Sequence, residues 1–171
     1  MTSTTRQPLW IFADWDETIT SKDTLYLIAP PDDNKPNSSP PFSFFSEYYM
    51  SITRDFDTWF GPRDTLARQF EYLDELGPAE KESIRKIEEF GLFKNIRIED
   101  IKERSKDVTF RPGWEEFIGL VKKKEDLVRF IAVLSVNWSG VFIRTALERS
   151  LGSEFVETFE IRANVPPYSS E

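Results

Sequence analysis

The sequence predicts an α/β fold, with a Rossmann-like parallel sheet and an inserted block of helices. Two apolar runs, at residues 9–13 and 127–134, show almost no polar alternation, which is typical of strands covered on both faces of a parallel sheet. In the stretch between them, apolar residues recur every three or four positions, as on one face of a helix. We therefore expect an α/β core formed by residues 1–29 and 107–171, with a helical insertion at residues 42–106.

The first apolar run ends abruptly in two carboxylates. Asp14 and Asp16 follow residues 9–13 directly, and ligands of parallel α/β sheets bind beyond the carboxyl ends of the strands. Two acidic side chains at such a position suit a nucleophile and a proton-transfer partner. Acidic residues also end strands and begin turns, so a purely structural role for this pair is the alternative.

A proline-rich loop separates the first part of the core from the helical insertion. Residues 30–41 contain five prolines together with several Asn, Asp and Ser residues, which favour turns and remove backbone donors. We expect a surface loop here, which serves either as a linker or as a gate over a site.

Four helical segments are expected within residues 42–106. The first has an apolar face formed by Phe45, Tyr49, Ile52, Phe56, Trp59 and Phe60. Because proline favours the first turn of a helix, Pro62 and Pro78 are expected to open helices. Because glycine favours the end of a helix, Gly77 and Gly91 are expected to end them. Aromatic residues at this spacing are more typical of a helical core than of a binding surface.

The α/β pattern returns after the insertion. Pro112 is placed to open a helix, and the second apolar run then ends in a hydroxyl at Ser135. Residues 141–151 are expected to form a crossover helix that leads to a third strand at residues 155–162.

These motifs resemble those of the haloacid dehalogenase superfamily. The spacing Asp14-x-Asp16-x-Thr18 after an apolar strand resembles its first motif, and an apolar strand that ends in Ser135 resembles its second. Residues 110–116, Phe-Arg-Pro-Gly-Trp-Glu-Glu, also resemble the Arg-Pro-Gly segment before the second motif in the phosphoserine phosphatase-like branch. The resemblance implies a superfamily core in which the helical insertion is a cap over small substrates.

The resemblance also implies a reaction. It makes the chain a Mg²⁺-dependent phosphohydrolase that acts on a small phosphorylated metabolite, a phosphate monoester. Asp14 is then the nucleophile that forms an aspartyl-phosphate, while Asp16 protonates the leaving oxygen and later activates water. Both residues are the expected Mg²⁺ ligands, Asp14 through its carboxylate and Asp16 through its backbone carbonyl.

Four further residues receive roles from the same resemblance. The phosphate ligands are expected to be Thr18, Ser135 and Asn137. Asp23 lies near the place where phosphoserine phosphatases keep an acidic residue for the substrate amine.

The chain departs from the family pattern after Ser135. Neither a third-motif lysine nor a fourth-motif acidic cluster follows, and the last lysine is Lys124. The alternative hypothesis is therefore a truncated or catalytically incomplete relative with a binding or assembly role. In the family fold the first strand is central, so we expect either a homo-oligomer that pairs across its bare edge or a truncated product of a longer gene. A receiver-type phosphoacceptor domain, the third possibility, accommodates the helical insertion poorly.

The composition excludes several classes of protein. The chain has no cysteine and no histidine, which rules out a thiolate site, a Ser-His-Asp triad and imidazole-ligated zinc, and leaves oxygen-liganded Mg²⁺ as the main metal option. The net charge of -8 argues against nonspecific binding to nucleic acid. No apolar run approaches the ~20 residues of a membrane span, and the N-terminus lacks the apolar segment of a secretory signal. We therefore expect a cytoplasmic protein without membrane contact.

Overall fold

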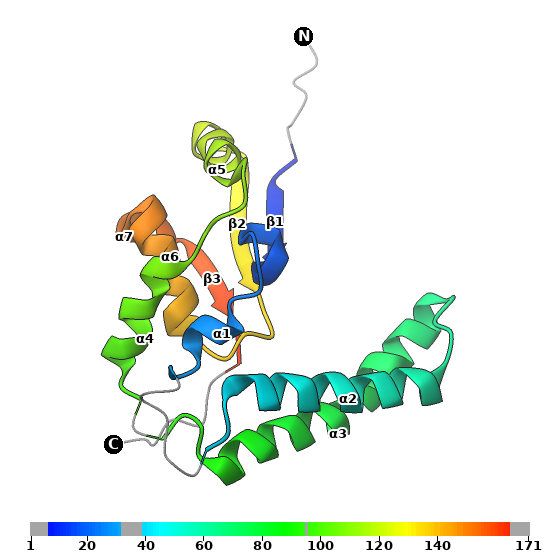
Figure 1. Cartoon of the computed structure of the whole chain (residues 1–171). Helices are drawn as coiled ribbons and strands as arrows, with labels where there is room; N and C mark the ends of the chain where they lie inside the picture. Colours follow the sequence, from blue (N-terminus) through cyan, green and yellow to red (C-terminus); the bar gives the residue numbers. More distant parts are fainter. Residues whose placement is uncertain (1–6, 32–38, 95, 165–171) are drawn as a thin grey trace. The chain divides into compact units, whose positions relative to one another are not determined.

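The protein has a mixed α/β fold in the computed structural model, which describes residues 7–31, 39–94 and 96–164 (Figure 1). The chain divides into two compact units. The first comprises Met1–Ile28 with Ile96–Pro166 and holds the sheet, and the second comprises Ala29–Asn95 with Pro167–Glu171 and holds two long helices. The predicted α/β class is therefore confirmed.

In the described residues, the sheet of the first unit has three parallel strands. They are β1 (Leu9–Asp14), β2 (Val128–Leu134) and β3 (Phe159–Arg162), and β2 lies between the other two. The register aligns the last residues of all three strands, because Asp14 pairs with Leu134 and Leu134 pairs with Arg162. The strands therefore end side by side at one edge of the sheet.

The first strand is less buried than the sequence predicted. Trp10 and Phe12 are 62% and 60% exposed, whereas residues 131–133 of β2 are buried. Trp10 and Phe12 contact the Phe130 ring, with centroids 5.3 and 5.7 Å away, and β1 has a neighbouring strand on one side only within the described sheet. The prediction of a strand covered on both faces is wrong for β1, because an apolar run reports hydrophobicity and not the number of layers that cover it.

Five α-helices accompany this sheet within the described part of the first unit. They are α1 (Leu25–Ile28), α4 (Ile98–Arg104), α5 (Trp114–Lys123), α6 (Gly140–Leu151) and α7 (Ser153–Val156). Helix α6 confirms the predicted crossover helix: the Ser139 hydroxyl accepts a hydrogen bond from the Phe142 backbone N–H (3.1 Å) at its start. Its end is marked by Gly152, whose φ of 86° is a conformation that favours glycine.

The third strand is shorter than expected. Residues 155 and 156 lie in α7 and not in β3, and Val156 is buried. The apolar side chains Phe155 and Phe159 pack ring against ring, with centroids 5.2 Å apart. A short turn between Val156 and Phe159 therefore separates a helix from a strand. Apolar residues on both sides of the turn hide this boundary in the sequence.

Helix α4 groups with the first unit, whereas the sequence placed residues 98–106 in the helical insertion. Ile101 is buried, and Arg149 of α6 donates a hydrogen bond to the Lys102 carbonyl (3.2 Å). Arg104 donates another to the Ile28 carbonyl (2.8 Å). These contacts connect α4 to elements of the α/β unit and correct the predicted boundary.

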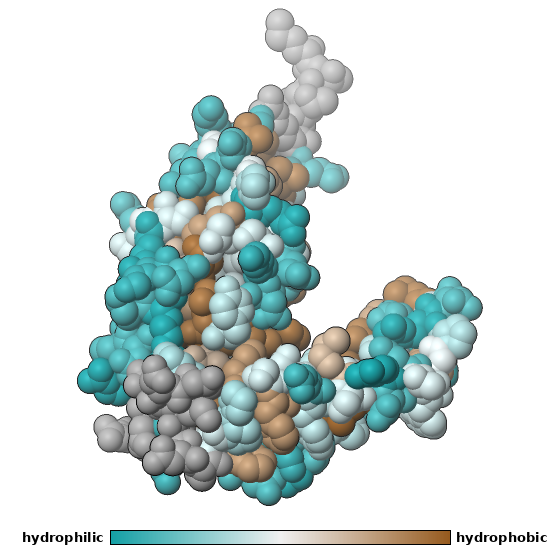
Figure 2. All heavy atoms as spheres, in the orientation of Figure 1, coloured by the Kyte–Doolittle hydropathy of each residue, from teal (hydrophilic) through white to brown (hydrophobic). Residues whose placement is uncertain are grey.

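The second unit is a hairpin of two antiparallel helices, α2 (Phe42–Phe60) and α3 (Leu66–Phe90). The Phe60 ring packs against Tyr72 at one end, with centroids 5.2 Å apart, and Phe45 packs against Phe90 at the other, at 6.0 Å. As predicted, the aromatic side chains of α2 pack within the helical unit, although Trp59 stays exposed. Hydrophobic residues also reach the surface of both units (Figure 2).

Helix α3 is continuous where the sequence predicted a break at Gly77 and Pro78. It begins at Leu66, with the Thr65 hydroxyl accepting a hydrogen bond from the Arg68 backbone N–H (3.1 Å), so Pro62 does not open it. Helix α3 contacts α2 on both sides of Pro78, through the Phe60–Tyr72 ring pair before it and the Phe45–Phe90 ring pair after it. That packing outweighs the local cost of an internal proline, about 3 kcal/mol. Gly91 does end the helix, as predicted.

Two remaining expectations concern the loop and the membrane. Most of the predicted proline-rich loop, residues 32–38, lies outside the described residues. Among the described helices, none combines the length and the apolarity that a membrane crossing requires.

Candidate functional site

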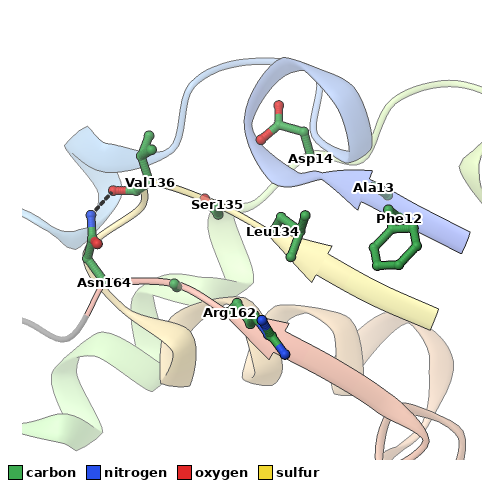
Figure 3. Close-up of a pocket in the computed structure, with 9 residues that line it drawn as sticks. Phe12, Ala13, Asp14, Leu134, Ser135, Val136, Arg162 and Asn164 are labelled. Carbon is green, nitrogen blue, oxygen red and sulfur yellow. Dashed lines mark hydrogen bonds between the residues drawn. The ribbon is translucent and has the colours of Figure 1, made fainter. Parts of the chain in front are cut away.

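The candidate site lies where the three strands end. Asp14 is the last residue of β1, and Ser135 directly follows β2. The Ser135 backbone N–H donates a hydrogen bond to the Arg162 carbonyl at the end of β3 (2.9 Å). Asp14, Ser135, Arg162 and Asn164 line one pocket of about 530 Å³ (Figure 3). The structure therefore brings the predicted nucleophile and the predicted second-motif hydroxyl to the same pocket.

Asp14 has an exposed carboxylate. The chain turns sharply after β1, through Trp15–Ile19, and this turn brings Thr18 back toward the strand end. The Thr18 hydroxyl donates a hydrogen bond to Asp14 Oδ2 (3.2 Å). An exposed carboxylate at a strand end has the access that a nucleophile needs.

Asp16 lies in a different environment, although it is only two residues away. Its Oδ1 accepts hydrogen bonds from the Thr24 backbone N–H (2.8 Å) and the Thr24 hydroxyl (2.6 Å), and its Oδ2 accepts one from Asn137 Nδ2 (3.3 Å). Burial raises the pKa of Asp16 above its usual range, and these hydrogen bonds only partly oppose that shift. A nearby Asp23 charge raises this pKa further. A raised pKa favours the protonated form, which is the form that donates a proton.

Thr24 is a site residue that the sequence analysis missed. It is buried, and its hydroxyl accepts hydrogen bonds from Trp15 Nε1 (2.9 Å) and Asn137 Nδ2 (3.0 Å) while it donates to Asp16. No motif marks a threonine eight residues after a carboxylate, so only the folded turn identifies it. Thr24 therefore fixes the orientation of the Asp16 carboxylate.

Asn137 is fully buried, and its hydrogen bonds connect the segment after β2 to the segment after β1. Besides its bonds to Asp16 and Thr24, its Oδ1 accepts a hydrogen bond from the Ser139 backbone N–H (3.2 Å). Its own backbone N–H donates to the Ser135 hydroxyl (2.9 Å). The contacts of Asn137 are thus made inside the protein, and its role as a phosphate ligand stays a prediction.

The turn after β1 is held by the Arg-Pro-Gly segment. Glu17, between Asp16 and Thr18, has a φ of 58°, in the left-handed region, and its carbonyl accepts a hydrogen bond from the Arg111 guanidinium. The Arg111 backbone N–H also donates to the Ile19 carbonyl (2.9 Å). The Arg-Pro-Gly segment, which in the sequence is only a family signature, therefore supports the backbone that carries both carboxylates.

Asp23 lies at the start of α1 and not in the pocket lining. Its Oδ1 accepts a hydrogen bond from the Leu25 backbone N–H (2.7 Å), which is the usual structural role of aspartate at the beginning of a helix. Its predicted contact with a substrate amine stays a prediction.

The site offers few protein ligands for Mg²⁺. Within the described residues, no group of three or more His, Cys, Asp or Glu side chains is placed to hold a metal ion. Mg²⁺ is often held by one or two carboxylates together with substrate phosphate oxygens and water. The exposed Asp14 carboxylate suits that weaker mode, with the Asp16 backbone carbonyl as a second hard oxygen.

Arg162 is a second residue that the sequence analysis missed. It ends β3, lines the pocket, and donates from Nε to Glu160. The sequence signal was present, because a charged residue at the end of an apolar strand is the feature that marked Asp14.

Comparison with known proteins identifies two relatives. Over 138 residues the chain is 32% identical to a CTO1 family protein of Schizosaccharomyces pombe, an alignment that covers 78% of this chain and 48% of that protein. Over 92 residues it is 33% identical to the bifunctional TH2 protein, mitochondrial, of Arabidopsis thaliana, covering 54% of this chain and 14% of that protein. No protein-family model matches the sequence, and no solved structure matches it. The chain thus spans at most about half the length of these curated relatives.

Proposed function

We propose that this chain is a haloacid dehalogenase superfamily relative whose strand-end site hydrolyses small phosphate monoesters, with Asp14 as nucleophile and Asp16 as acid and base. The observation that carries the proposal is the contrast between two carboxylates only two residues apart. Asp14 is exposed in the pocket, whereas Asp16 is half-buried, hydrogen-bonded to Thr24 and Asn137, and raised in pKa. Two neighbouring carboxylates in such different environments are typical of a pair in which one is the nucleophile and the other is the acid.

The proposed first step forms a covalent intermediate. An Asp14 carboxylate oxygen attacks phosphorus, and the bond from phosphorus to the ester oxygen breaks. Asp16 transfers its proton to that oxygen, so the product alcohol leaves neutral. Asp14 is then an aspartyl-phosphate and Asp16 is a carboxylate.

The proposed second step restores the site. Asp16 takes a proton from a water molecule while the water oxygen attacks phosphorus, and the bond from phosphorus to Asp14 breaks. Inorganic phosphate leaves, Asp14 is again a carboxylate and Asp16 is again protonated. In this proposal Thr18, which donates a hydrogen bond to Asp14, positions the phosphorylated aspartate. Ser135, which lines the pocket, binds the phosphoryl oxygens.

A bound Mg²⁺ at Asp14 would reduce the repulsion between the anionic nucleophile and the anionic phosphate. If the site holds no Mg²⁺ that supports turnover, a role other than catalysis is favoured. The exposed Trp10 and Phe12 on β1 favour, as the second candidate, a relative in which this strand serves binding or assembly.

The test compares two substrates with leaving groups of different basicity. p-Nitrophenyl phosphate needs little protonation of its leaving oxygen, whereas an alkyl phosphate needs it fully. With Mg²⁺, Asp14→Asn is expected to abolish turnover of both substrates. Asp16→Asn is expected to lose roughly 10²–10⁴-fold on the alkyl phosphate and clearly less on the aryl phosphate.

The matched control is Asp126→Asn, which removes an exposed carboxylate just before β2, at the opposite end of the strand from the site. Its turnover should stay within twofold of the unmodified chain. A folded protein that turns over neither substrate with Mg²⁺ would contradict the enzyme proposal and favour the binding or assembly role.

A further inference from the structure

The pocket at the strand ends contains two opposite charges on the same face of the sheet. Asp14, Leu134 and Arg162 are paired in register across β1, β2 and β3, and residues paired in register project from the same face. Figure 3 shows them as one row, with Leu134 between the other two. All three line the pocket.

The chemistry proposed for Asp14 needs a cation close by. A carboxylate and a phosphate monoester are both anions, and their approach is unfavourable unless positive charge is placed beside them. Among the described residues that line this pocket, Arg162 is the one with a positive charge. A planar guanidinium also matches a phosphate group, because it can donate two parallel hydrogen bonds to two oxygens.

The spacing permits both groups to reach one phosphate. Adjacent strands lie about 4.8 Å apart, so the Asp14 and Arg162 backbones are separated by roughly 10 Å. An extended arginine side chain covers much of that distance across Leu134, and the phosphate occupies the rest. Phe12, Leu134 and Val136 supply an apolar floor beneath it.

The present partner of Arg162 does not prevent this role. Its guanidinium is paired with Glu160, and the two side chains are 72% and 37% exposed. Exposed ion pairs are weak, whereas a guanidinium that binds a phosphate makes two charge-assisted hydrogen bonds. The ion pair with Glu160 therefore leaves the guanidinium available to an anion in the pocket.

We propose that Arg162 is the phosphate-binding residue of this pocket, and that its guanidinium holds the substrate phosphate against Asp14. The inference rests on the proposed function for the identity of the substrate, a phosphate monoester. It assigns a positive charge in the pocket to the end of β3.

The experiment measures binding of inorganic phosphate to the full chain by NMR titration, at fixed ionic strength and in the presence of Mg²⁺. Arg162→Gln is expected to raise the Kd at least tenfold. Arg162→Lys is expected to have a Kd between those of the unmodified chain and Arg162→Gln, because lysine keeps the charge but cannot donate two parallel hydrogen bonds. Glu160→Gln is expected to leave the Kd unchanged or lower it, because the guanidinium is then released from its ion pair. Arg129→Gln, which removes an exposed charge from the start of β2, should change the Kd less than twofold.

The inference is overturned if Arg162→Gln binds phosphate as the unmodified chain does, or if Arg129→Gln weakens binding equally. It is also overturned if the unmodified chain binds no phosphate. Because the readout is binding and not turnover, it separates the two proposals. Binding that depends on Arg162 without any turnover would support this inference and contradict the proposed reaction, whereas turnover that depends on Asp14 with an unchanged KM in Arg162→Gln would do the opposite.

Discussion

Asp16 shows at the scale of one residue how the fold adjusts a carboxylate. Burial raises its pKa, although Thr24 and Asn137 donate hydrogen bonds to it. A folded-state pKa above that of the unfolded chain, about 3.9, means that the folded protein binds this proton more tightly. The stability that the protonated group contributes is therefore fully present below about pH 3.9 and is lost as the pH rises through the raised pKa.

This linkage predicts the effect of Asp16→Asn. The variant should lose the part of the pH dependence that lies between about pH 3.9 and the raised pKa, so its stability relative to the unmodified chain increases as the pH rises through that window. Urea unfolding at a series of pH values measures the difference. Asp126→Asn serves as the control and should keep the original pH profile; an identical profile for Asp16→Asn would contradict the assignment.

Glu17 carries the backbone strain of the site. Its φ of 58° costs an ordinary residue roughly 1–2 kcal/mol, whereas glycine adopts it freely but loses more entropy on folding, about 0.5–1 kcal/mol. Glu17→Gly is therefore expected to stabilise the first unit slightly, by roughly 0.5 kcal/mol. Glu115→Gly, in the first turn of α5, should instead destabilise it by about 1 kcal/mol. Thermal unfolding measures both variants. A higher Tm for Glu17→Gly with a lower Tm for Glu115→Gly would support backbone strain at Glu17, and an equal fall in Tm for both would contradict it.

Single residues also show what the sequence could and could not predict. Asp14 and Ser135 were found because each follows a recognisable apolar run. Thr24 carries no sequence signal, and Arg111 belongs to a family signature without an assigned contact. Their hydrogen bonds to Asp16 and to the Glu17 carbonyl depend on a turn whose path no local pattern specifies. Arg162 could have been predicted in the same way, since the predicted third strand ends at this residue, as β3 does.

At the scale of elements, the sequence predicted those that carry local signals in agreement with their packing. Helix α6 has a serine at its start and Gly152 at its end, and β2 is an apolar run whose residues 131–133 are buried. The division of residues 62–91 failed because Gly77 and Pro78 are local signals for a helix boundary, while the contacts that keep α3 continuous come from α2, far away in the sequence. The predicted burial of β1 is wrong for the same reason: the burial of a strand depends on its neighbours in space, which the sequence of the strand does not specify.

Pro78 should therefore weaken the helix in which it lies. It has no N–H for the intrahelical hydrogen bond, and proline is less favourable than alanine in a helix interior by about 3 kcal/mol. Pro78→Ala is expected to stabilise the second unit by roughly 1–3 kcal/mol, measured by urea unfolding followed by far-UV circular dichroism. Pro62→Ala, between α2 and α3, is the control and should change stability by less than about 0.5 kcal/mol. A loss of stability in Pro78→Ala would show that the proline favours the observed helix pair.

At the scale of the whole molecule, the free side of β1 is the feature that its own chain leaves unexplained. In the described sheet β1 has a neighbour on one side only, and Trp10 and Phe12 are largely exposed. Unpaired backbone groups on an apolar edge strand favour pairing with another strand. The interface is expected to be small, because two half-exposed aromatic side chains bury at most roughly 300 Å² per chain, against about 800 Å² in a stable complex.

We therefore expect weak self-association through β1, seen as a rise in average mass with concentration in sedimentation equilibrium. Phe12→Lys should reduce it, because a charged side chain on an edge strand opposes pairing. Leu120→Lys, which alters an exposed apolar residue of α5, is the matched control and should leave association unchanged. If Phe12→Lys and Leu120→Lys reduced association equally, general surface hydrophobicity would explain it; if the unmodified chain stayed monomeric at every concentration, the free edge of β1 would not be a pairing surface for a second copy.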